Sequence, residues 1–321
     1  MTRRSSVPPP VTAVLDASSR WLPAELVQVE DLLREQLCGH GELLARDAEA
    51  TLAAGGKRLR PMLVLLCAGE EGGEDAVRAA AAIELVHMAT LVHDDVLDAA
   101  PLRRGRATVA AASGRAAAVA VGDLLFARAF ALLGAAGGDR AVGLLAEASV
   151  ALARGELAQR QDAYDTRVSE QRYLDRCRLK TAKLFECACL LGRYEKEMAQ
   201  YGSQIGLAFQ LLDDVLDVSG PAERTGKARG TDLLDGTVTL PLILAARVDP
   251  AIAAVDLRAL DPAAAEELCD RIEATGVLTE VRSRALETIA GAKVALGSAA
   301  FDPEQRRLLE LVADGVVQRY S

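Results

Sequence analysis

The 321-residue sequence has few aromatic residues and, over a long central stretch, no proline. Phe, Trp and Tyr make up 3% of the chain, and because aromatic residues favour strands, their scarcity argues against an all-β fold. No proline occurs between Leu102 and Gly220, a stretch rich in Ala, Leu, Arg and Glu. These residues favour helices, so the sequence predicts an all-α bundle.

Histidine, paired cysteines and excess positive charge are also lacking. The chain has three histidines and six cysteines, and no two cysteines have the spacing of a zinc site. This usage is typical of reduced cysteines in a cytoplasmic protein. The net charge of -9 argues against nucleic acid as a partner, since phosphate binding depends on clustered Lys and Arg.

Long uncharged apolar segments are missing as well. The most apolar stretch, around Val119 to Leu133, is interrupted by Asp123 and Arg128. It falls short of the roughly 18 residues that a membrane span needs, and no targeting segment is visible. We therefore expect no membrane span.

The chain divides into a flexible lead, residues 1–21, and one helical domain, residues 22–321. Proline and glycine positions predict the helix limits. The expected helices cover about 23–37, 62–68, 76–98, 116–134, 140–164, 169–192 and 196–218. A polar loop follows over residues 220–236.

One acidic pentapeptide occurs twice, as Asp94–Asp98 and as Asp213–Asp217, each at the end of a predicted helix. Residues four apart share a helix face, so the first and last carboxylates of each copy are neighbours. Carboxylates repel one another and meet the negative end of the helix dipole there. A solvated acidic helix end is the plain alternative, but two identical copies favour binding of a hard cation such as Mg²⁺.

Each pentapeptide continues a stripe along its helix. The stripes are His87, Thr90, Asp94 and Asp98 in the first, and Gly206, Gln210, Asp213 and Asp217 in the second. If the two helices faced each other, they would form a pocket with an acidic mouth and an apolar shaft. Such a pocket suits an amphiphile with an anionic head.

Basic residues occur near both motifs. They are Lys57, Arg58 and Arg60; Arg103 and Arg104; Lys180 and Lys183; and Lys227 and Arg229. Diphosphate oxygens are bound by such groups. Together with the aspartates, they predict two diphosphate sites bridged by metals.

The motifs resemble those of the trans-isoprenyl diphosphate synthases, the polyprenyl synthetase family. The matching stretches are GGKRLRP at 55–61, ELVHMATLVHDDVLD at 84–98 with LRRG at 102–105, and GD at 122–123. They continue with GELAQ at 155–159, KTA at 180–182, GLAFQLLDDVLD at 206–217, GKARGTDL at 226–233 and TLPL at 239–242. The resemblance implies helices around a central apolar cavity, a homodimer and about three Mg²⁺ ions. The substrates would be isopentenyl diphosphate and an allylic diphosphate.

The resemblance also implies residue roles. Asp94, Asp98 and Asp213 would bind metal, with Asp95, Asp214 and Asp217 in support. The isopentenyl diphosphate contacts would be Lys57, Arg60, His87 and Arg104. The allylic diphosphate contacts would be Arg103, Lys180, Thr181, Gln210 and Lys227. Thr237 departs from the family, which often has lysine there, and this removes one cation.

Ala89 and Thr90 stand where short-chain members of the family carry Phe or Tyr. Small side chains leave the shaft open, which predicts a product of about six to ten isoprene units. A geranylgeranyl or farnesyl diphosphate synthase is the alternative. A terpene cyclase and a non-catalytic partner subunit rank lower, because both aspartate motifs are complete. His93 falls off the Asp94 face, and we expect a structural role for it.

Overall fold

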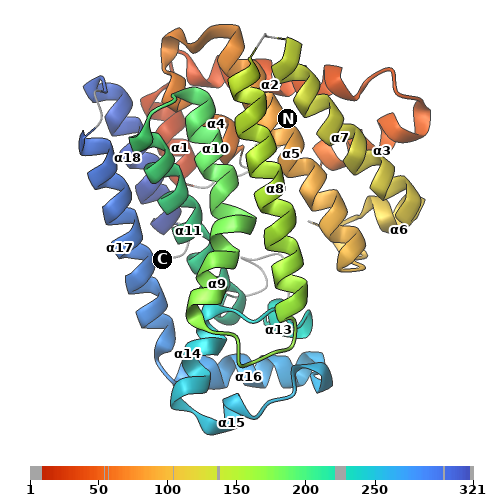
Figure 1. Cartoon of the computed structure of the whole chain (residues 1–321), viewed down its shortest axis with the longest axis vertical. Coiled ribbons are helices and arrows are strands. Elements are labelled where there is room, and N and C mark those ends of the chain that lie inside the picture. Colours follow the sequence, from red (N-terminus) through yellow and green to blue (C-terminus); the bar gives the residue numbers. More distant parts are fainter. Residues whose placement is uncertain are drawn as a thin grey trace, which may run out of the picture. The chain divides into compact units, whose positions relative to one another are not determined.

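The computed structural model describes residues 9–53, 55–56, 58–103, 105–135, 138–220, 229–298 and 301–318. These residues are almost entirely helical, which confirms the predicted all-α fold (Figure 1). The chain forms two compact units. Unit 1 contains Met1–Ser149, Phe185–Ala199 and Ala300–Val312, and unit 2 contains Val150–Leu184, Gln200–Ala299 and Ala313–Ser321.

Unit 1 is built mainly from the first half of the chain. Its elements are α1 (Pro9–Ala17), α2 (Leu22–Leu37), α3 (Glu42–Ala53), α4 (Leu59–Ala68), η1 (Glu70–Gly72), α5 (Gly73–Leu97), β1 (Leu102–Arg103), β2 (Arg106–Ala107), α6 (Val109–Ser113) and α7 (Arg115–Ala135). It also holds the first part of α8 (Asp139–Asp162), most of α10 (Lys183–Gly192) and most of α18 (Pro303–Gln318).

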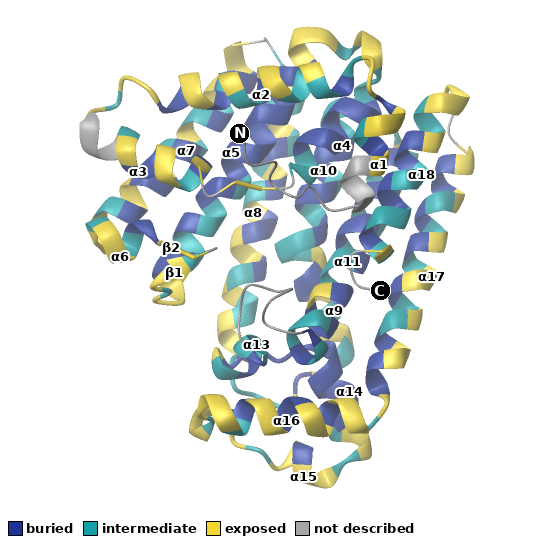
Figure 2. Cartoon of the chain, turned by 180° about the vertical axis from the view of Figure 1, so that it is seen from behind, coloured by how far each residue is buried: buried dark blue, intermediate teal, exposed yellow. Residues whose placement is uncertain are grey.

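Helix α5 forms the centre of unit 1. Every residue from Ala79 to Val86 is buried, as the dark colour of α5 in Figure 2 shows. A helix that is apolar on all sides must be covered on all sides, and α5 packs against α7, α4 and α2. The first aspartate motif therefore lies at the end of a core helix.

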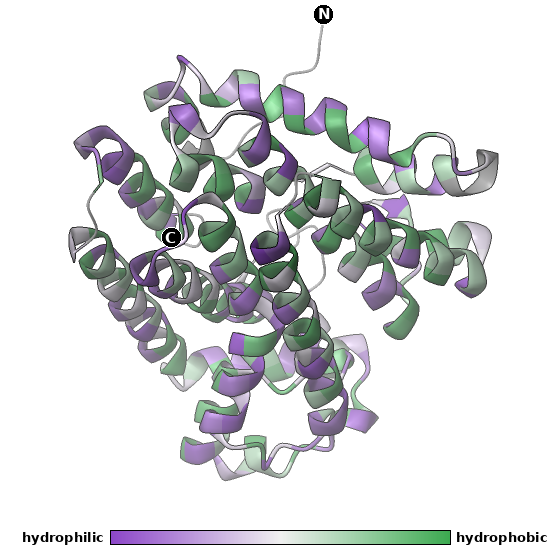
Figure 3. Cartoon of the chain, turned by 45° about the horizontal axis from the view of Figure 1, so that its top comes forward, coloured by the Kyte–Doolittle hydropathy of each residue, from purple (hydrophilic) through white to green (hydrophobic). Residues whose placement is uncertain are grey.

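Unit 2 holds the second motif and most of the C-terminal half. Its elements are α9 (Glu170–Cys177), η2 (Arg178–Ala182), α11 (Lys196–Ser219), α13 (Thr231–Leu234), α14 (Leu240–Val248), α15 (Pro250–Ala253), η3 (Leu257–Ala259), α16 (Pro262–Ala274) and α17 (Val277–Ser298). Helix α14 packs against α17, α16 and α9. Side chains of Ser169 and Asp261 accept hydrogen bonds at the starts of α9 and α16, as N-cap residues do. Figure 3 shows hydrophilic and hydrophobic residues alternating around most helices.

The structure differs from the expected helix pattern in several places, and α13 forms within the polar loop expected over 220–236. Helix α1 forms within the segment predicted as a flexible lead, where Val14 and Ser18 are buried. Helix α3 was not predicted. The helix expected over 169–192 is interrupted by η2, a π-helical turn at the KTA motif. Such turns are frequent at functional sites.

Two described helical segments, Glu70–Leu97 and Arg115–Ala135, are long and apolar enough to cross a membrane by length and composition. The first is mostly buried, as expected for the core helix of unit 1, whereas less than half of the second is buried.

Candidate active site

The two aspartate motifs share one feature of burial, a buried second carboxylate. In the first, Asp95 is buried, Asp94 is half-buried and Asp98 is exposed. In the second, Asp214 is buried, Asp217 is half-buried and Asp213 is exposed. In both copies the second carboxylate is thus part of the protein interior, and the first and last are accessible.

Arg103 binds the buried carboxylate of the first motif. Its Nε and Nη2 lie 2.8 and 2.7 Å from Asp95 Oδ1. Arg103 belongs to the β1–β2 hairpin, in which Arg103 pairs with Arg106 and Gly105 takes a positive φ of 74°. The hairpin that follows α5 therefore folds back and neutralises a buried charge, which would otherwise be costly.

Helix α5 ends in a tight backbone turn directly after the motif. The amide of Ala100 donates to the carbonyl of Asp95 at 3.0 Å, and that of Asp98 donates to Asp94 at 2.8 Å. Between them Ala99 has a φ of 51°, the left-handed conformation that glycine usually provides at this position. An alanine in this conformation costs roughly 1–2 kcal/mol, so the backbone directly after the first motif is strained.

Neutral side chains hold the buried carboxylate of the second motif. The hydroxyl of Tyr173 donates to Asp214 Oδ2 at 2.5 Å, and Gln210 Nε2 donates to Asp214 Oδ1 at 2.7 Å. Thr181 Oγ1 in turn donates to Gln210 Oε1 at 2.8 Å. The network joins α9, η2 and α11, and it connects two residues of the predicted allylic diphosphate site.

This difference in partners affects the charge of the second motif. Burial, together with the nearby Asp232 carboxylate, raises the pKa of Asp214 to about 7. The hydrogen bonds from Tyr173 and Gln210 act in the opposite direction. Burial beside that carboxyl also raises the pKa of Tyr173 well above its usual value, so the tyrosine stays a hydrogen-bond donor.

Lys180 lies in the π turn, close to α8. Its ammonium forms an ion pair with Glu156, which also pairs with Arg160 at 2.7 Å. Burial alone would raise the pKa of Glu156, but Lys180 and Arg160 hold that pKa below its usual value. Gly155 permits this approach, because a Cβ there would lie 2.5 Å from Lys180 N. Gly155 thus allows the backbone of Lys180 to lie close to α8, and Glu156 holds the ammonium group of Lys180 in position.

The GGKRLRP stretch enters α4 through a strained residue. Arg58 has a φ of 48° and pairs with Glu30 and with Glu84, the latter at 2.6 Å. The guanidinium of Arg60 lies 4.4 Å from the ring centre of Phe185. Burial lowers the pKa of Arg60 to about 10, so it remains charged at neutral pH. The Arg58 side chain is thus held by ion pairs to two glutamates, and the Arg60 guanidinium lies over the ring of Phe185.

The remaining predicted residues fall into two groups. On α5, His87 and Thr90 are half-buried and Ala89 is buried. His93 lies against α7, with Nε2 3.4 Å from Val119 O and 3.6 Å from Asp123 Oδ1, in agreement with its predicted direction away from Asp94. Lys57, Arg104 and Lys227 lie outside the described residues. That the two motif helices face each other stays a prediction.

The donor atoms suit Mg²⁺. Among the residues that the structure describes, no three His, Cys, Asp or Glu side chains gather to hold a metal ion by themselves. Mg²⁺ is commonly bound by one or two carboxylates together with substrate phosphates and water. An accessible pair such as Asp94 and Asp98 fits that mode, and a bound diphosphate would complete it.

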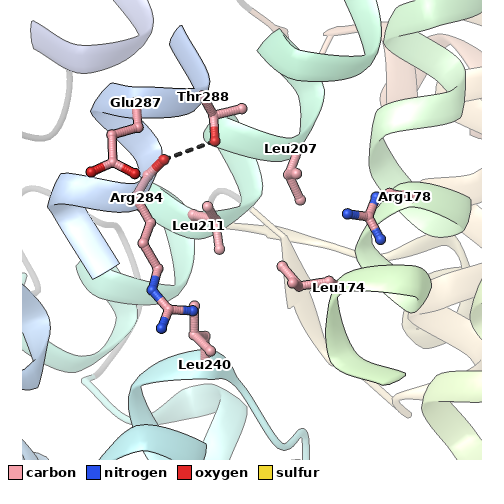
Figure 4. A pocket seen from close by; sticks show the side chains of 8 residues that line it. All are labelled: Leu174, Arg178, Leu207, Leu211, Leu240, Arg284, Glu287 and Thr288. Carbon is pink, nitrogen blue, oxygen red and sulfur yellow. Dashed lines mark hydrogen bonds between the residues drawn. The ribbon is translucent and has the colours of Figure 1, made fainter. Parts of the chain in front are cut away.

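Unit 2 also contains a surface pocket of about 360 Å³ (Figure 4). Its lining comprises Leu174, Arg178, Leu207, Leu211, Leu240, Arg284, Glu287 and Thr288. Arg178 and Arg284 are paired with Asp175 and Glu170. The pocket includes none of the predicted site residues.

Comparison with known proteins identifies the family. Residues 41–272 match the polyprenyl synthetase family. The chain belongs to the polyprenyl synthetase family. This membership confirms the predicted resemblance and the prediction of a prenyltransferase that makes polyprenyl diphosphates.

The relatives include long-chain and shorter-chain enzymes. Heptaprenyl diphosphate synthase component 2 of Geobacillus stearothermophilus is 41% identical, over 75% of this chain and 79% of that protein. Octaprenyl diphosphate synthase of Escherichia coli is 39% identical, over 68% and 71%. Geranylgeranyl pyrophosphate synthase of Geoglobus acetivorans is 36% identical, over 91% and 95%.

A solved structure shows the same fold. The polyprenyl synthase of Caulobacter crescentus, crystallised with calcium and isoprenyl diphosphate, aligns with a TM-score of 0.89 and 35% identity. The alignment covers 97% of this chain and 98% of that one.

The sequence did not reveal two residues that organise the site, Tyr173 and Glu156, which contact Asp214 and Lys180. Arg58 is predicted among the diphosphate-binding cations, whereas the structure pairs it with Glu30 and Glu84. Glu156 stands inside a motif that carries the resemblance, which was the available signal. Tyr173 stands outside every such motif.

Proposed function

We propose that this protein condenses isopentenyl diphosphate with an allylic diphosphate to form an all-trans polyprenyl diphosphate of about six to ten isoprene units. The observation that carries the proposal is the repeated pentapeptide. Both copies end a long helix, bury their second carboxylate and leave the first and last accessible. This shared arrangement supports cation binding more than it supports a solvated acidic surface.

The proposed roles follow from charge and geometry. Arg60 and His87 in unit 1 would bind isopentenyl diphosphate, and Lys180 in unit 2 would bind the leaving diphosphate of the allylic substrate. Mg²⁺, which Asp94, Asp98 and Asp213 would hold, offsets negative charge on diphosphate oxygens when bound. Breaking the allylic C–O bond leaves a carbocation, so the apolar wall of α5 must exclude water.

Product length depends on space beside the first motif. Ala89 is buried and Thr90, one turn before Asp94, is half-buried with its hydroxyl donating to His87 O at 2.8 Å. Neither side chain is bulky, which supports a long product, as do the heptaprenyl and octaprenyl relatives. A geranylgeranyl pyrophosphate synthase is also among the relatives, so a product of four isoprene units is the second candidate.

The proposal includes a homodimer formed through α7. This helix is strongly apolar, yet less than half of it is buried in the described chain, and Val119 is 43% exposed. A second copy would cover that face. The Geobacillus relative is named component 2, so a complex with a different partner subunit is the alternative to the homodimer.

We propose a cytoplasmic enzyme, whose product could be passed to a membrane enzyme.

Removal of metal and of single carboxylates tests the function. Activity should require a divalent cation, and Asp94→Ala or Asp213→Ala should each lower the rate by several powers of ten, since metal stabilisation contributes on the order of several kcal/mol. Glu267→Ala, an exposed carboxylate on α16, is the control and should leave the rate unchanged. Full turnover in excess EDTA would disprove the proposal.

Bulky side chains on α5 test the product length. Ala89→Phe and Thr90→Phe should shorten the product while the first condensation continues, because an aromatic ring would fill the path of the growing chain. Chromatography of the dephosphorylated products measures the shift. An unchanged product distribution in both variants would show that the growing chain does not pass Ala89 and Thr90.

A further inference from the structure

Tyr173 is a buried tyrosine on α9 whose hydroxyl donates a hydrogen bond to the second aspartate motif. The residue is 1% exposed and Asp214 is 2% exposed, and the O–O distance between them is 2.5 Å. A buried carboxyl group without hydrogen-bond donors is costly, so the Tyr173 hydroxyl stabilises the buried Asp214 by donating to it.

The ring of Tyr173 is itself held in place. The guanidinium carbon of Arg176 lies 5.4 Å from the ring centre. Arg176 is buried, pairs with Asp162 at 3.4 Å and donates to the carbonyl of Val238 at 2.5 Å. The tyrosine hydroxyl therefore reaches Asp214 from a fixed support formed by α8, α9 and the segment before α14.

The hydrogen bonds have a fixed direction beyond Asp214. Gln210 turns its NH₂ group towards Asp214 Oδ1 and its carbonyl oxygen towards the Thr181 hydroxyl. The distances, 2.7 and 2.8 Å, agree with this order. Asp214 thus orients Gln210, and Gln210 orients the Thr181 hydroxyl in the π turn.

We propose that Tyr173 is a positioning residue for the second aspartate motif, acting through Asp214 on the accessible carboxylates Asp213 and Asp217. The assignment rests on the proposed function. In the first motif, Arg103 has the corresponding place beside Asp95. Partners behind metal ligands commonly change metal affinity by about 10- to 100-fold when removed.

Tyr173→Phe tests the assignment, because it removes the hydroxyl and keeps the ring. The probe is Mn²⁺ with inorganic diphosphate, and the free Mn²⁺ is measured by electron paramagnetic resonance. The dissociation constant for Mn²⁺ should rise about tenfold. The Mg²⁺ concentration for half-maximal activity should rise in parallel, while the KM for isopentenyl diphosphate stays within about twofold.

Tyr201→Phe is the matched control, since Tyr201 is a second fully buried tyrosine of unit 2 and lies on α11 more than three helical turns before the motif. It should leave Mn²⁺ binding unchanged. Thermal unfolding verifies that each variant is folded. If Tyr173→Phe does not fold, Gln210→Leu removes the other donor to Asp214 and should weaken Mn²⁺ binding in the same direction.

Three outcomes separate the positioning role from the proposed function. If the wild-type protein binds Mn²⁺ and diphosphate and the folded Tyr173→Phe variant binds them equally well, the positioning role is wrong. If Tyr173→Phe does not fold, wild-type affinity in Gln210→Leu overturns it instead. If the wild-type protein itself binds neither, the proposed function is wrong.

Discussion

Replacing Gly155 with alanine would place a Cβ atom 2.5 Å from the backbone nitrogen of Lys180 and 2.8 Å from its Cα and Cβ. Ordinary contact between such atoms needs about 3.5 Å, so α8 and the π turn must separate by about 1 Å. The nitrogen and Cα in the way belong to the backbone, and the Cβ is fixed by them, so none can rotate aside. The shift would also disturb the ion pair between Lys180 and the adjacent Glu156.

The expected loss follows from that displacement. Moving a substrate-binding group by about 1 Å can cost about 100-fold in rate, and overpacking costs about 1–3 kcal/mol of stability. We expect kcat/KM for the allylic diphosphate to fall about 100-fold. The KM for isopentenyl diphosphate should change little, because its predicted contacts are in unit 1.

Steady-state kinetics with each substrate varied in turn measures the effect. Gly143→Ala is the control on the same helix, since a Cβ there meets nothing within 4 Å. It should raise stability by roughly 0.5–1 kcal/mol and leave both KM values unchanged. Wild-type kinetics and unfolding in Gly155→Ala would refute the close approach of α8 to the π turn.

Three further predictions concern binding and stability. Arg60→Ala should raise the KM for isopentenyl diphosphate, and Lys180→Ala that for the allylic substrate, each by about 10-fold or more; separate titrations that show one substrate weakened by both variants would contradict the assignment. Thr237→Lys adds a cation near Gln159, 3.5 Å from the Thr237 hydroxyl, and should lower the allylic KM several-fold, whereas Thr237→Met should not. Burial and then Glu70 raise the pKa of Glu25 to about 7, so the folded state holds a proton that the unfolded chain releases near pH 4.5, and stability falls as the pH rises through this window. Glu25→Gln should therefore stabilise the protein at pH 8 by about 1 kcal/mol, after discounting for solvent screening, and equal denaturant midpoints at pH 8 would contradict this.

The helices that carry the motifs were largely predictable from the sequence. The expected helix at 196–218 is observed as Lys196–Ser219, because its apolar residues recur with helical spacing and glycine and proline follow. The same reasoning placed the first motif at the end of a long helix, observed as Gly73–Leu97. The direction of His93 also followed from helix geometry alone.

The contacts that distinguish the two motifs were not predictable. Asp95 and Asp214 stand in identical pentapeptides, yet one is bound by Arg103 and the other by Tyr173, 41 residues away in sequence. Such pairing depends on tertiary packing, which local spacing in one sequence does not reveal. The π turn at 178–182 was missed for the same reason, since it accompanies the close approach of Gly155.

The central claim is a metal-dependent enzyme that elongates an allylic diphosphate to a long chain. The most direct measurement incubates the pure full-length protein with Mg²⁺, labelled isopentenyl diphosphate and farnesyl diphosphate, followed by chromatography of the dephosphorylated products. We predict all-trans products of about six to ten isoprene units, and none in excess EDTA. Products that stop at three or four units would contradict the open path beside Ala89 and Thr90, and undiminished turnover in EDTA would contradict the role of the aspartate motifs.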